Sequence, residues 1–309
     1  MLGSCQPPIT PDPEPLTLPL QDEDQLRAIQ FWDAQSGLAV GGQRFDEDVI
    51  LRTDDGGANW KRIRPVRELK KMIFDLHIEN EQSIWGTAMD GKLLQSKNGG
   101  MTWDLIQQAY WLPMHSIFSV TDSILVAVGG VGYSVGQIVR STDAGQNWTL
   151  LDTTDFELRD VFFTDQQTGY ACGYGVILKS TDAGLTWEFT EARRGFFSAM
   201  DWPTPRIGYV VGRAGTIIKT TDGGSQWQKL RNGNNPLLPY ESYNEIKCWD
   251  ENHLYIVGDK GILKYSDDGG NNWQRIELDT KVHLHGLYLT GPREGWVCGS
   301  EGFMSQFEW

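Results

Sequence analysis

Short apolar runs separated by turn residues follow one another along most of the chain. Residues 158–189 read LRDVFFTDQQTGYACGYGVILKSTDAGLTWEF, and the runs RDVFFTD, YACGY, VILKST and TWEF are rich in β-branched and aromatic residues. This composition predicts short β-strands, and the Gly-rich and polar segments between them predict tight turns. Four short strands joined in this way are typical of one blade of a β-propeller.

The same order of runs occurs seven times. The first strands begin at Arg27, Phe74, His115, Arg159, Ser198, Asn244 and His285. Each is followed by a run that ends in a Gly-containing turn and by a third apolar run, such as VILRT at 49–53 or TIIKT at 216–220. The pattern predicts an all-β, seven-bladed β-propeller of four-stranded blades, forming one domain over residues 15–309.

The last repeat lacks a fourth strand, because the chain stops after its third run, at Trp309. The run PLTLPL at 15–20 is apolar and has no place in the first repeat. Its Pro19 would be tolerated on an edge strand, and pairing with the last blade would protect an otherwise bare sheet edge. We therefore expect this N-terminal strand to close the ring in the last blade.

A polar eight-residue motif, Ser/Thr-x-Asp/Asn-x-Gly-x-x-Trp, joins the third run to the fourth in six repeats. Its Asp/Asn and Trp positions are Asp55, Trp60, Asn98, Trp103, Asp143, Trp148, Asp182, Trp187, Asp222, Trp227, Asp268 and Trp273. Successive tryptophans are 43, 45, 39, 40 and 46 residues apart, which are periods of solenoids or propellers. The Asp and hydroxyl groups can accept backbone N–H bonds, the Gly supplies a positive φ, and the Trp packs on its neighbours. Six copies favour a structural role over a catalytic one.

These repeats resemble known proteins. The motif is that of Asp-box (BNR) repeat proteins, and GYVVGRAGTIIKTTDGGSQW at 208–227 is similar to the repeat of the photosystem II assembly and stability factor family. The resemblance covers about residues 26–309. It implies a seven-bladed propeller without enzymatic activity, exported to the lumen or periplasm and often lipidated at its N-terminus. It also implies a binding or assembly scaffold that docks a polypeptide or membrane-protein partner.

Composition narrows the function classes. A net charge of −14 argues against a general nucleic-acid binder, and no run of 18 apolar residues is present to span a membrane. Four scattered cysteines match no metal motif and no disulfide framework, and Cys172 and Cys298, at matching repeat positions, are expected to be buried. We expect no cofactor, no metal and a monomer.

The N-terminus carries a candidate lipid anchor at Cys5, in the lipobox-like sequence LGSC. No apolar signal core precedes it, so a trimmed signal, a misassigned start and a chance match all remain open. The segment QPPITPDPEP holds five of the 13 prolines and predicts an extended linker over residues 1–14. We expect a periplasmic or cell-envelope protein that reaches the membrane only through this anchor.

Basic and aromatic residues gather on the predicted face opposite the Asp boxes, in second-to-third strand turns and blade linkers. The predicted partner-binding residues are Arg44, Arg193, Arg194, Arg213, Phe196, Phe197 and Tyr174, with Arg27 and Arg159 at the rim. Arginine beside aromatic residues is the composition of interface hot spots, and guanidinium groups suit carboxylates and carbonyls of a partner. The alternative is ordinary solvated charge with blade-capping aromatic residues.

Asp boxes also occur in sialidases and other glycoside hydrolases. A sialidase needs three clustered arginines, a Tyr nucleophile with its Glu, and an Asp, and the motif context for these is not found. Other glycosidases need two carboxylates that flank the scissile bond. Two of Glu301, Asp259 and Asp90, in turns of the face opposite the Asp boxes, could form such a pair. We expect no catalytic residues and a binding scaffold. The alternatives are a carbohydrate-active enzyme and a glycan-binding module.

Overall fold

The computed structural model describes residues 18–21, 23–64, 69–107, 111–231 and 239–309. The predicted linker at 1–14 and the predicted lipidation site Cys5 lie outside these residues. Over the described ranges the chain forms antiparallel β-sheets and one short 3₁₀ helix.

The strands follow the predicted order. Blade one contains β1 (Gln25–Phe31), β2 (Gly37–Gln43), β3 (Glu47–Thr53) and β4 (Lys61–Arg62). Blade two contains β5 (Ile73–Asn80), β6 (Ser83–Ala88), β7 (Lys92–Ser96) and β8 (Asp104–Gln107). Blade three contains β9 (Met114–Ser119), β10 (Leu125–Val131), β11 (Val135–Ser141) and β12 (Thr149–Thr154). Blades four and five share β13 (Leu158–Phe163), β14 (Gly169–Ser180), β15 (Glu188–Asp201), β16 (Gly208–Gly212), the 3₁₀ helix η1 (Arg213–Gly215), β17 (Ile217–Thr220) and β18 (Gln228–Arg231). Blade six contains β19 (Tyr243–Cys248), β20 (Leu254–Gly258), β21 (Ile262–Ser266) and β22 (Gln274–Arg275). Blade seven contains β23 (Leu284–Gly291), β24 (Glu294–Gly299) and β25 (Met304–Glu308).

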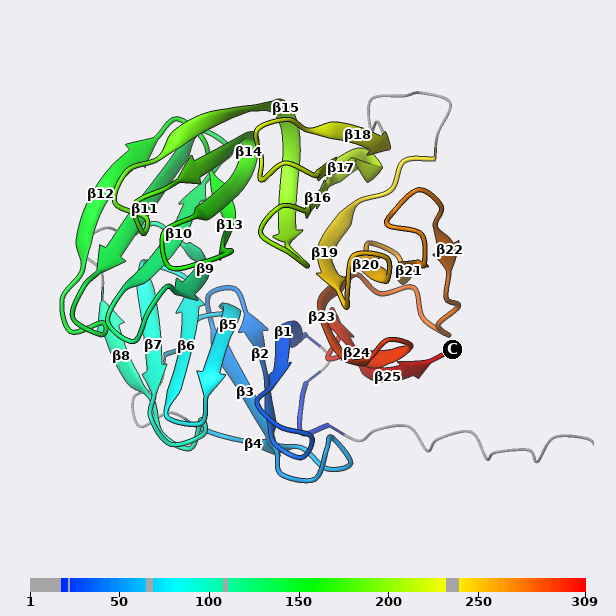
Figure 1. Cartoon of the computed structure of the whole chain (residues 1–309). Coiled ribbons are helices and arrows are strands. Elements are labelled where there is room, and N and C mark those ends of the chain that lie inside the picture. Colours follow the sequence, from blue (N-terminus) through cyan, green and yellow to red (C-terminus); the bar gives the residue numbers. More distant parts are fainter. Residues whose placement is uncertain (1–17, 22, 65–68, 108–110, 232–238) are drawn as a thin grey trace, which may run out of the picture.

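The inner strands form a closed ring around a central channel (Figure 1). In the described part of the chain, β1 contacts β5, β5 contacts β9 and β9 contacts β13. The ring continues through β15, β19 and β23 back to β1. Because β15 belongs to two blades, the described strands group into seven blades. The fold is the all-β propeller that the sequence predicts.

Two strands are longer than the sequence pattern predicts. β14 spans the second and third runs of repeat four, with a φ of 91° at Gly175 between its two halves. β15 pairs with β14 from Glu188 to Phe196 and with β16 from Phe197 to Asp201. Blades four and five are therefore joined by continuous β-structure in place of a loop.

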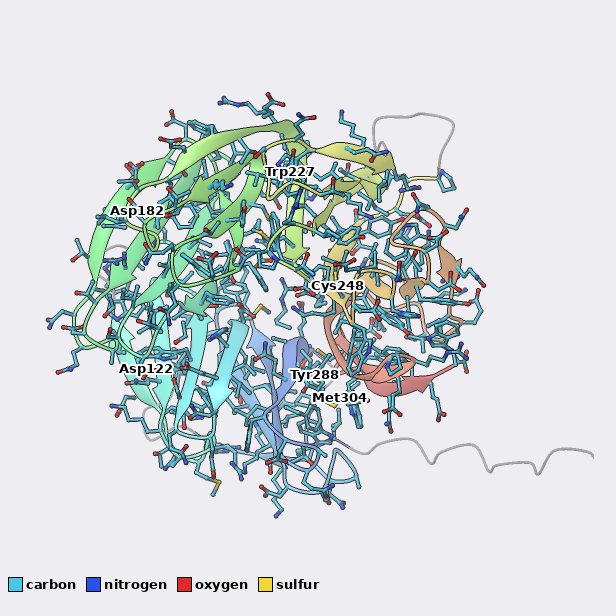
Figure 2. The ribbon with its side chains drawn as sticks, in the orientation of Figure 1. Asp122, Asp182, Trp227, Cys248, Tyr288 and Met304 are labelled. Carbon is cyan, nitrogen blue, oxygen red and sulfur yellow. The ribbon has the colours of Figure 1, made fainter. Side chains whose placement is uncertain are left out.

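The Asp boxes are turns closed by their own side chains. In the copy that ends at Trp187, the Ser180 hydroxyl accepts a hydrogen bond from the N–H of Gly184, and Asp182 Oδ1 accepts one from the N–H of Thr186, both at 2.9 Å. The Trp187 indole donates to the Gly184 carbonyl at 3.0 Å. The other five copies repeat the first two bonds. Figure 2 shows Asp182 toward the outer edge of the ring in this view.

The boxes also join neighbouring blades. Tyr170 and Lys179 of blade four each donate a 2.7 Å hydrogen bond to the carbonyl of Gly223, in the box of blade five. A Cβ atom on Gly224 would lie 2.7 Å from the Tyr170 ring, so this position has no room for a larger residue. Bonds of the same kind run to the boxes of blades two, four and six from Arg52, Arg140 and Lys219. The motif is thus explained by turn geometry and blade packing.

The apolar core lies between neighbouring blades, where each cluster combines side chains of two adjacent blades. Blades six and seven, and blades seven and one, are packed in the same way. Cys172 and Cys298 are 0% exposed and belong to two different clusters. Burial of apolar surface between every pair of blades is what stabilises the ring.

Residues 18–20 pack on blade seven and do not form the part of the predicted strand that falls on them. Leu18 and Leu20 pack against a cluster that contains Trp296. The N–H of Leu20 bonds to the carbonyl of Leu18 at 2.9 Å, which turns the chain at Pro19. A turned backbone cannot extend a ladder, and the described sheet of blade seven has three strands. The predicted pairing is therefore corrected to side-chain packing for 18–20, and residues 15–17 lie outside the described chain.

Candidate functional site

The two ends of the blades carry different features. In blade one, Gln25 at the start of β1 pairs with Gly42 at the end of β2, whereas Gly37 pairs with Thr53 at the start of the Asp box. The Asp boxes therefore lie at one end of the strands and the second-to-third strand turns at the other. At this other end lies a cavity of about 500 Å³, here called the channel mouth, and it shares lining residues with a cavity of about 490 Å³ inside the ring.

Four arginines line the channel mouth: Arg27, Arg44, Arg159 and Arg213. Arg159 pairs with Glu157 at 3.1 Å. Among the residues that the structure describes, the other three have no carboxylate within ion-pair distance. Burial lowers the pKa of Arg27 to about 10, and the charges of Arg159 and Arg44 act in the same direction. The mouth of an acidic protein is thus locally cationic, which attracts anionic ligands.

Glu157 ties several parts of the mouth together. Its carboxylate accepts hydrogen bonds from Arg159 and from the N–H of Tyr133, both at 3.1 Å, and lies 3.1 Å from Nε2 of His115. Burial would raise the pKa of Glu157, but the His115 bond and the Arg159 charge lower it to about 2. Burial, with the charge of Arg159, lowers the pKa of His115 to about 4, so this ring is neutral near pH 7. The Glu157 carboxylate is therefore paired with Arg159 and His115 in the wall of the channel mouth. It does not neutralise Arg27, Arg44 or Arg213, which can bind a ligand.

Aromatic rings surround Arg213. Its guanidinium lies 5.4 Å from the ring of Tyr133 and 5.3 Å from that of Tyr174, and it donates a 3.2 Å hydrogen bond to the Tyr133 hydroxyl. Phe196 meets Tyr174 edge to face at 5.5 Å. Tyr133 and Phe196 are each 51% exposed. Arg213 thus lies between the exposed ring of Tyr133 and the buried ring of Tyr174, and arginine beside aromatic residues is the composition of interface hot spots.

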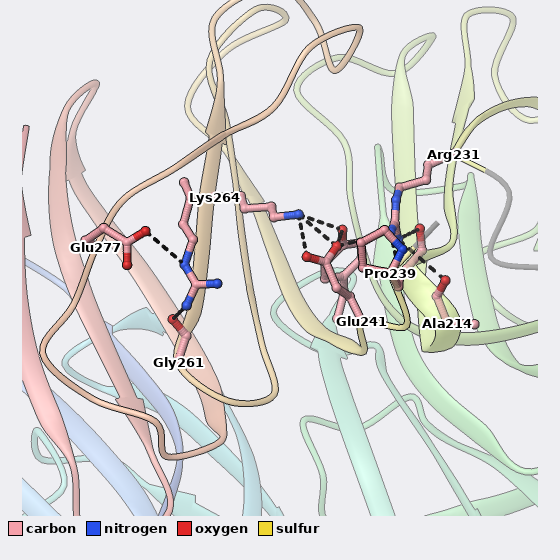
Figure 3. A network of polar contacts seen from close by, with 10 residues as sticks. Ala214, Arg231, Pro239, Glu241, Gly261, Lys264 and Glu277 are labelled. Atoms are coloured by element: carbon pink, nitrogen blue, oxygen red, sulfur yellow. Dashed lines mark hydrogen bonds and ion pairs between the residues drawn. The ribbon is translucent and has the colours of Figure 1, made fainter. Parts of the chain in front are cut away.

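A polar network holds the 3₁₀ helix η1, which carries Arg213 (Figure 3). Arg231 donates to the carbonyl of Gly215 at 2.8 Å and pairs with Glu241 at 3.2 Å. Lys264 pairs with the same carboxylate at 2.8 Å. Arg231 is therefore neutralised inside the protein and positions η1, in contrast to the unpaired arginines of the mouth.

The structure brings part of the predicted partner-binding set together. The channel mouth is lined by Arg44, Arg213 and Tyr174, and a neighbouring pocket is lined by Arg193, Arg213, Phe196 and Phe197. Phe197 is 3% exposed and packs between blades four and five, so its predicted role as an exposed anchor is corrected. Side chains alternate along a strand, which turns Phe196 outward and Phe197 inward. The side chain of Arg194 lies outside what the structure describes.

Two residues of the mouth were not predicted from the sequence. Tyr133, with a φ of 69°, lies in the turn between β10 and β11, and Glu157 immediately precedes β13. The sequence feature that points to Tyr133 is the segment GGVGYSVG at 129–136. It is longer than the segments that join the second and third strands in the later repeats. Glu157 has no local signal, because its role depends on contacts with His115 in blade three.

Farther inside, the channel wall is acidic. Asp75, Asp160 and Glu245 lie on the inner strands β5, β13 and β19, and Lys247 lies 3.5 Å from Glu245. Burial raises the pKa of Asp75 to about 7 and, together with its carboxylate neighbours, that of Glu245 to about 8. Burial would lower the pKa of Lys247, but Glu245 and Asp201 raise it, so the amine stays charged.

Stability should depend on pH through these carboxylates. The pKa of Asp75 rises from 3.8 to about 7 on folding, so the folded protein binds this proton more tightly than the unfolded chain does. The contribution of this carboxyl group to the free energy of unfolding should therefore fall as pH rises from about 4 to about 8, while the lowered pKa of His115 contributes with the opposite sign. Asp75→Asn should flatten this dependence and stabilise the protein at the alkaline end. Urea denaturation at about pH 5 and about pH 8 measures both effects, and an unchanged slope in the variant would contradict the assignment.

The carboxylates considered for glycoside hydrolysis lie in turns, and two of them contact basic side chains. Asp90 and Glu301 have φ values of 58° and 57°, in turns that continue with a glycine. Asp90 pairs with Lys71 at 3.2 Å, and Asp259 lies 3.0 Å from His283. Within the described ranges, no group of three or more His, Cys, Asp or Glu side chains is placed to hold a metal ion. No helix in the described part of the chain is long and apolar enough to cross a membrane.

The closed ring of blades and the Asp-box turns define an Asp-box (BNR) propeller. Residues 13–154 and 195–290 match the family described as Photosynthesis system II assembly factor YCF48, and the chain belongs to this family. A curated relative, the Photosystem II assembly lipoprotein Ycf48 of Synechococcus sp. (strain CC9902), is 25% identical over 126 residues. That alignment spans 39% of this chain and 34% of the relative, about a third of its length.

Solved structures share the fold over almost the whole chain. A structure of YCF48 bound to D1 peptide has a TM-score of 0.73 at 18% identity, covering 95% of this chain and 94% of that one. YCF48 from Cyanidioschyzon merolae has a TM-score of 0.70 at 19% identity, covering 94% and 97%. An ancestral GH74 enzyme has a TM-score of 0.69 at 16% identity, covering 93% of this chain but 45% of the enzyme. Identities this low establish the fold alone.

Proposed function

We propose that this protein is a non-enzymatic assembly factor that binds an acidic segment of a polypeptide at the channel mouth. The observation that carries the proposal is the set of three arginines, Arg27, Arg44 and Arg213, that lie beside aromatic rings without a carboxylate partner among the described residues. A polypeptide supplies carboxylates for the guanidinium groups and apolar side chains for the rings. Membership of the assembly-factor family and the D1 peptide bound to a YCF48 relative support this proposal.

The proposed organisation places one propeller, residues 15–309, behind a spacer of residues 1–14. Cys5 would carry a lipid that keeps the monomer close to a membrane, in the cell envelope or a lumen. The name of the curated relative, an assembly lipoprotein, supports this arrangement. A membrane protein under assembly would then lie within reach, and the net charge of −14 disfavours nucleic acid as a partner.

Binding of D1 peptides tests the proposal. Overlapping synthetic peptides of D1 are titrated with the full chain, and fluorescence anisotropy reports binding. Acidic peptides should bind, and their affinity should fall between about 0.1 M and about 1 M salt, as the screening length drops from about 10 Å to about 3 Å. Binding of basic peptides alone, or binding indifferent to salt, would contradict the proposal.

A glycoside hydrolase is the second candidate, because an ancestral GH74 enzyme shares the propeller fold. The candidate carboxylates Asp90 and Asp259 are engaged in ion pairs or hydrogen bonds within turns, which disfavours this candidate. The protein should release no sugar from sialosides or β-glucans, measured by a reducing-end assay. If the wild type released sugar and the Asp259→Asn variant did not, the protein would be an enzyme and the scaffold proposal would fail.

A further inference from the structure

The interface between blades four and five differs from others in one side chain of its outer strand. Three residues after the box tryptophan, an apolar side chain packs toward the next blade, and these side chains are Ile63, Ile106, Leu230 and Ile276. Blade four has Thr190 at this position. Its buried hydroxyl has no hydrogen-bond partner among the described residues. A shorter, polar side chain therefore stands where other blades place Ile or Leu.

A pocket of about 270 Å³ opens at the same interface. Its apolar walls are Ala192, Phe196 and Phe197 of β15, Ile218 of β17, and Trp227 at the start of the outer strand. Arg193, Arg213, Lys229 and Glu191 supply its charged lining. The pocket is smaller than the roughly 300–1,000 Å³ of small-molecule sites, so its size suits one side chain.

Trp227 differs from most of the other box tryptophans. Four of them donate their indole N–H to the glycine carbonyl of their own box, at 2.9 to 3.0 Å. Nε1 of Trp227 is buried without an acceptor in the described structure. Trp60 and Trp202 also have an Nε1 without an acceptor, but neither of them lines this pocket. A buried donor without an acceptor costs stability, so this wall of the pocket is not fully satisfied by the described residues.

We infer that this pocket receives one apolar side chain, of the size of leucine or phenylalanine, from the polypeptide whose acidic residues bind the channel mouth. The inference rests on the proposed function. Arg213 lines both the mouth and the pocket, so the two are continuous along a bound chain. The arginines at the pocket match acidic residues next to the anchor.

Peptide binding by the full chain tests the inference with a defined probe. Acidic Gly/Ser peptides carry one variable residue, either Leu, Phe or Ala, placed in turn at each position. The best Leu or Phe peptide should bind the wild type about tenfold more tightly than its Ala counterpart, as expected for burial of one such side chain. Ala192→Phe fills the pocket and should remove this preference. Thr190→Ile, which adds volume to the same interface without lining the pocket, should keep it.

The thermal melting curve of each variant makes the result independent of folding defects. Salt-sensitive binding without any preference for Leu or Phe would overturn the pocket and leave the proposed function intact. A preference that survives in a folded Ala192→Phe variant would also overturn it. If no acidic peptide binds at all, the proposed function fails, and the inference fails with it.

Discussion

Trp187→Ala should lower the free energy of unfolding by about 3–5 kcal/mol, as truncation of a packed aromatic residue does. The Trp187 ring meets Phe163 edge to face at 6.0 Å, in the cluster between blades three and four. Its indole also satisfies the Gly184 carbonyl at 3.0 Å. The alanine variant loses the ring contacts and this hydrogen bond together. Urea denaturation followed by circular dichroism measures the loss.

Asp182→Ala is the matched change in the same box. Its carboxylate accepts bonds from the N–H groups of Leu185 and Thr186 but buries little surface, so we expect a loss of about 0.5–2 kcal/mol. The Thr186 hydroxyl bond is the first cause of its lowered pKa, so this stabilisation should be lost as pH falls below about 4. If either variant lost peptide binding at unchanged stability, the Asp box would be part of the functional site.

Charge reversal at the channel mouth should have the largest effect on binding. The double change Arg44→Glu and Arg213→Glu should lower the affinity for acidic D1 peptides by about a hundredfold or more. Each change removes a charged hydrogen bond to the peptide and adds charge repulsion. Both side chains are exposed, so the fold should be preserved. Anisotropy titration and thermal melting of the same samples measure the two quantities.

A control with the same change in net charge separates local from long-range effects. Lys97→Glu and Arg206→Glu reverse two exposed charges near the Asp boxes, where the carbonyl of Arg206 accepts the N–H of Gly223. These changes should alter affinity only slightly. An equal loss in the two double variants would mean that binding depends on net charge and not on the mouth.

The blades could be predicted because each repeat carries its own turn chemistry. Residues 180–187 specify a closed turn locally, and apolar runs on either side must become strands to bury their side chains. The conformation of residues 18–20 was predicted less well. The bond from the Leu20 N–H to the Leu18 carbonyl turns this segment, whereas its composition predicts a strand. The fusion of two blades through β15 also has no signal, since its register depends on both neighbours.

The sequence predicted which kinds of residue form the candidate site better than it predicted how they are arranged. Arg44, Arg213 and Tyr174 come together because turns of different blades meet at one end of the ring. The burial of Phe197 could not be predicted, because only the register of β15 decides which of two adjacent phenylalanines is buried. Tyr133 joins Glu157 through a bond between segments 24 residues apart, which no local pattern contains.

Photo-crosslinking from the two ends of the propeller tests the central claim most directly. A photoreactive amino acid replaces Phe196, at the channel-mouth end, or Leu185, in an Asp box, and these side chains are 51% and 52% exposed. Each variant is irradiated with the acidic D1 peptide that binds best, and mass spectrometry locates the crosslinks. We expect crosslinks from position 196 that are lost in high salt, and none from position 185. Crosslinks from position 185 alone, or equally from both, would contradict binding at the channel mouth.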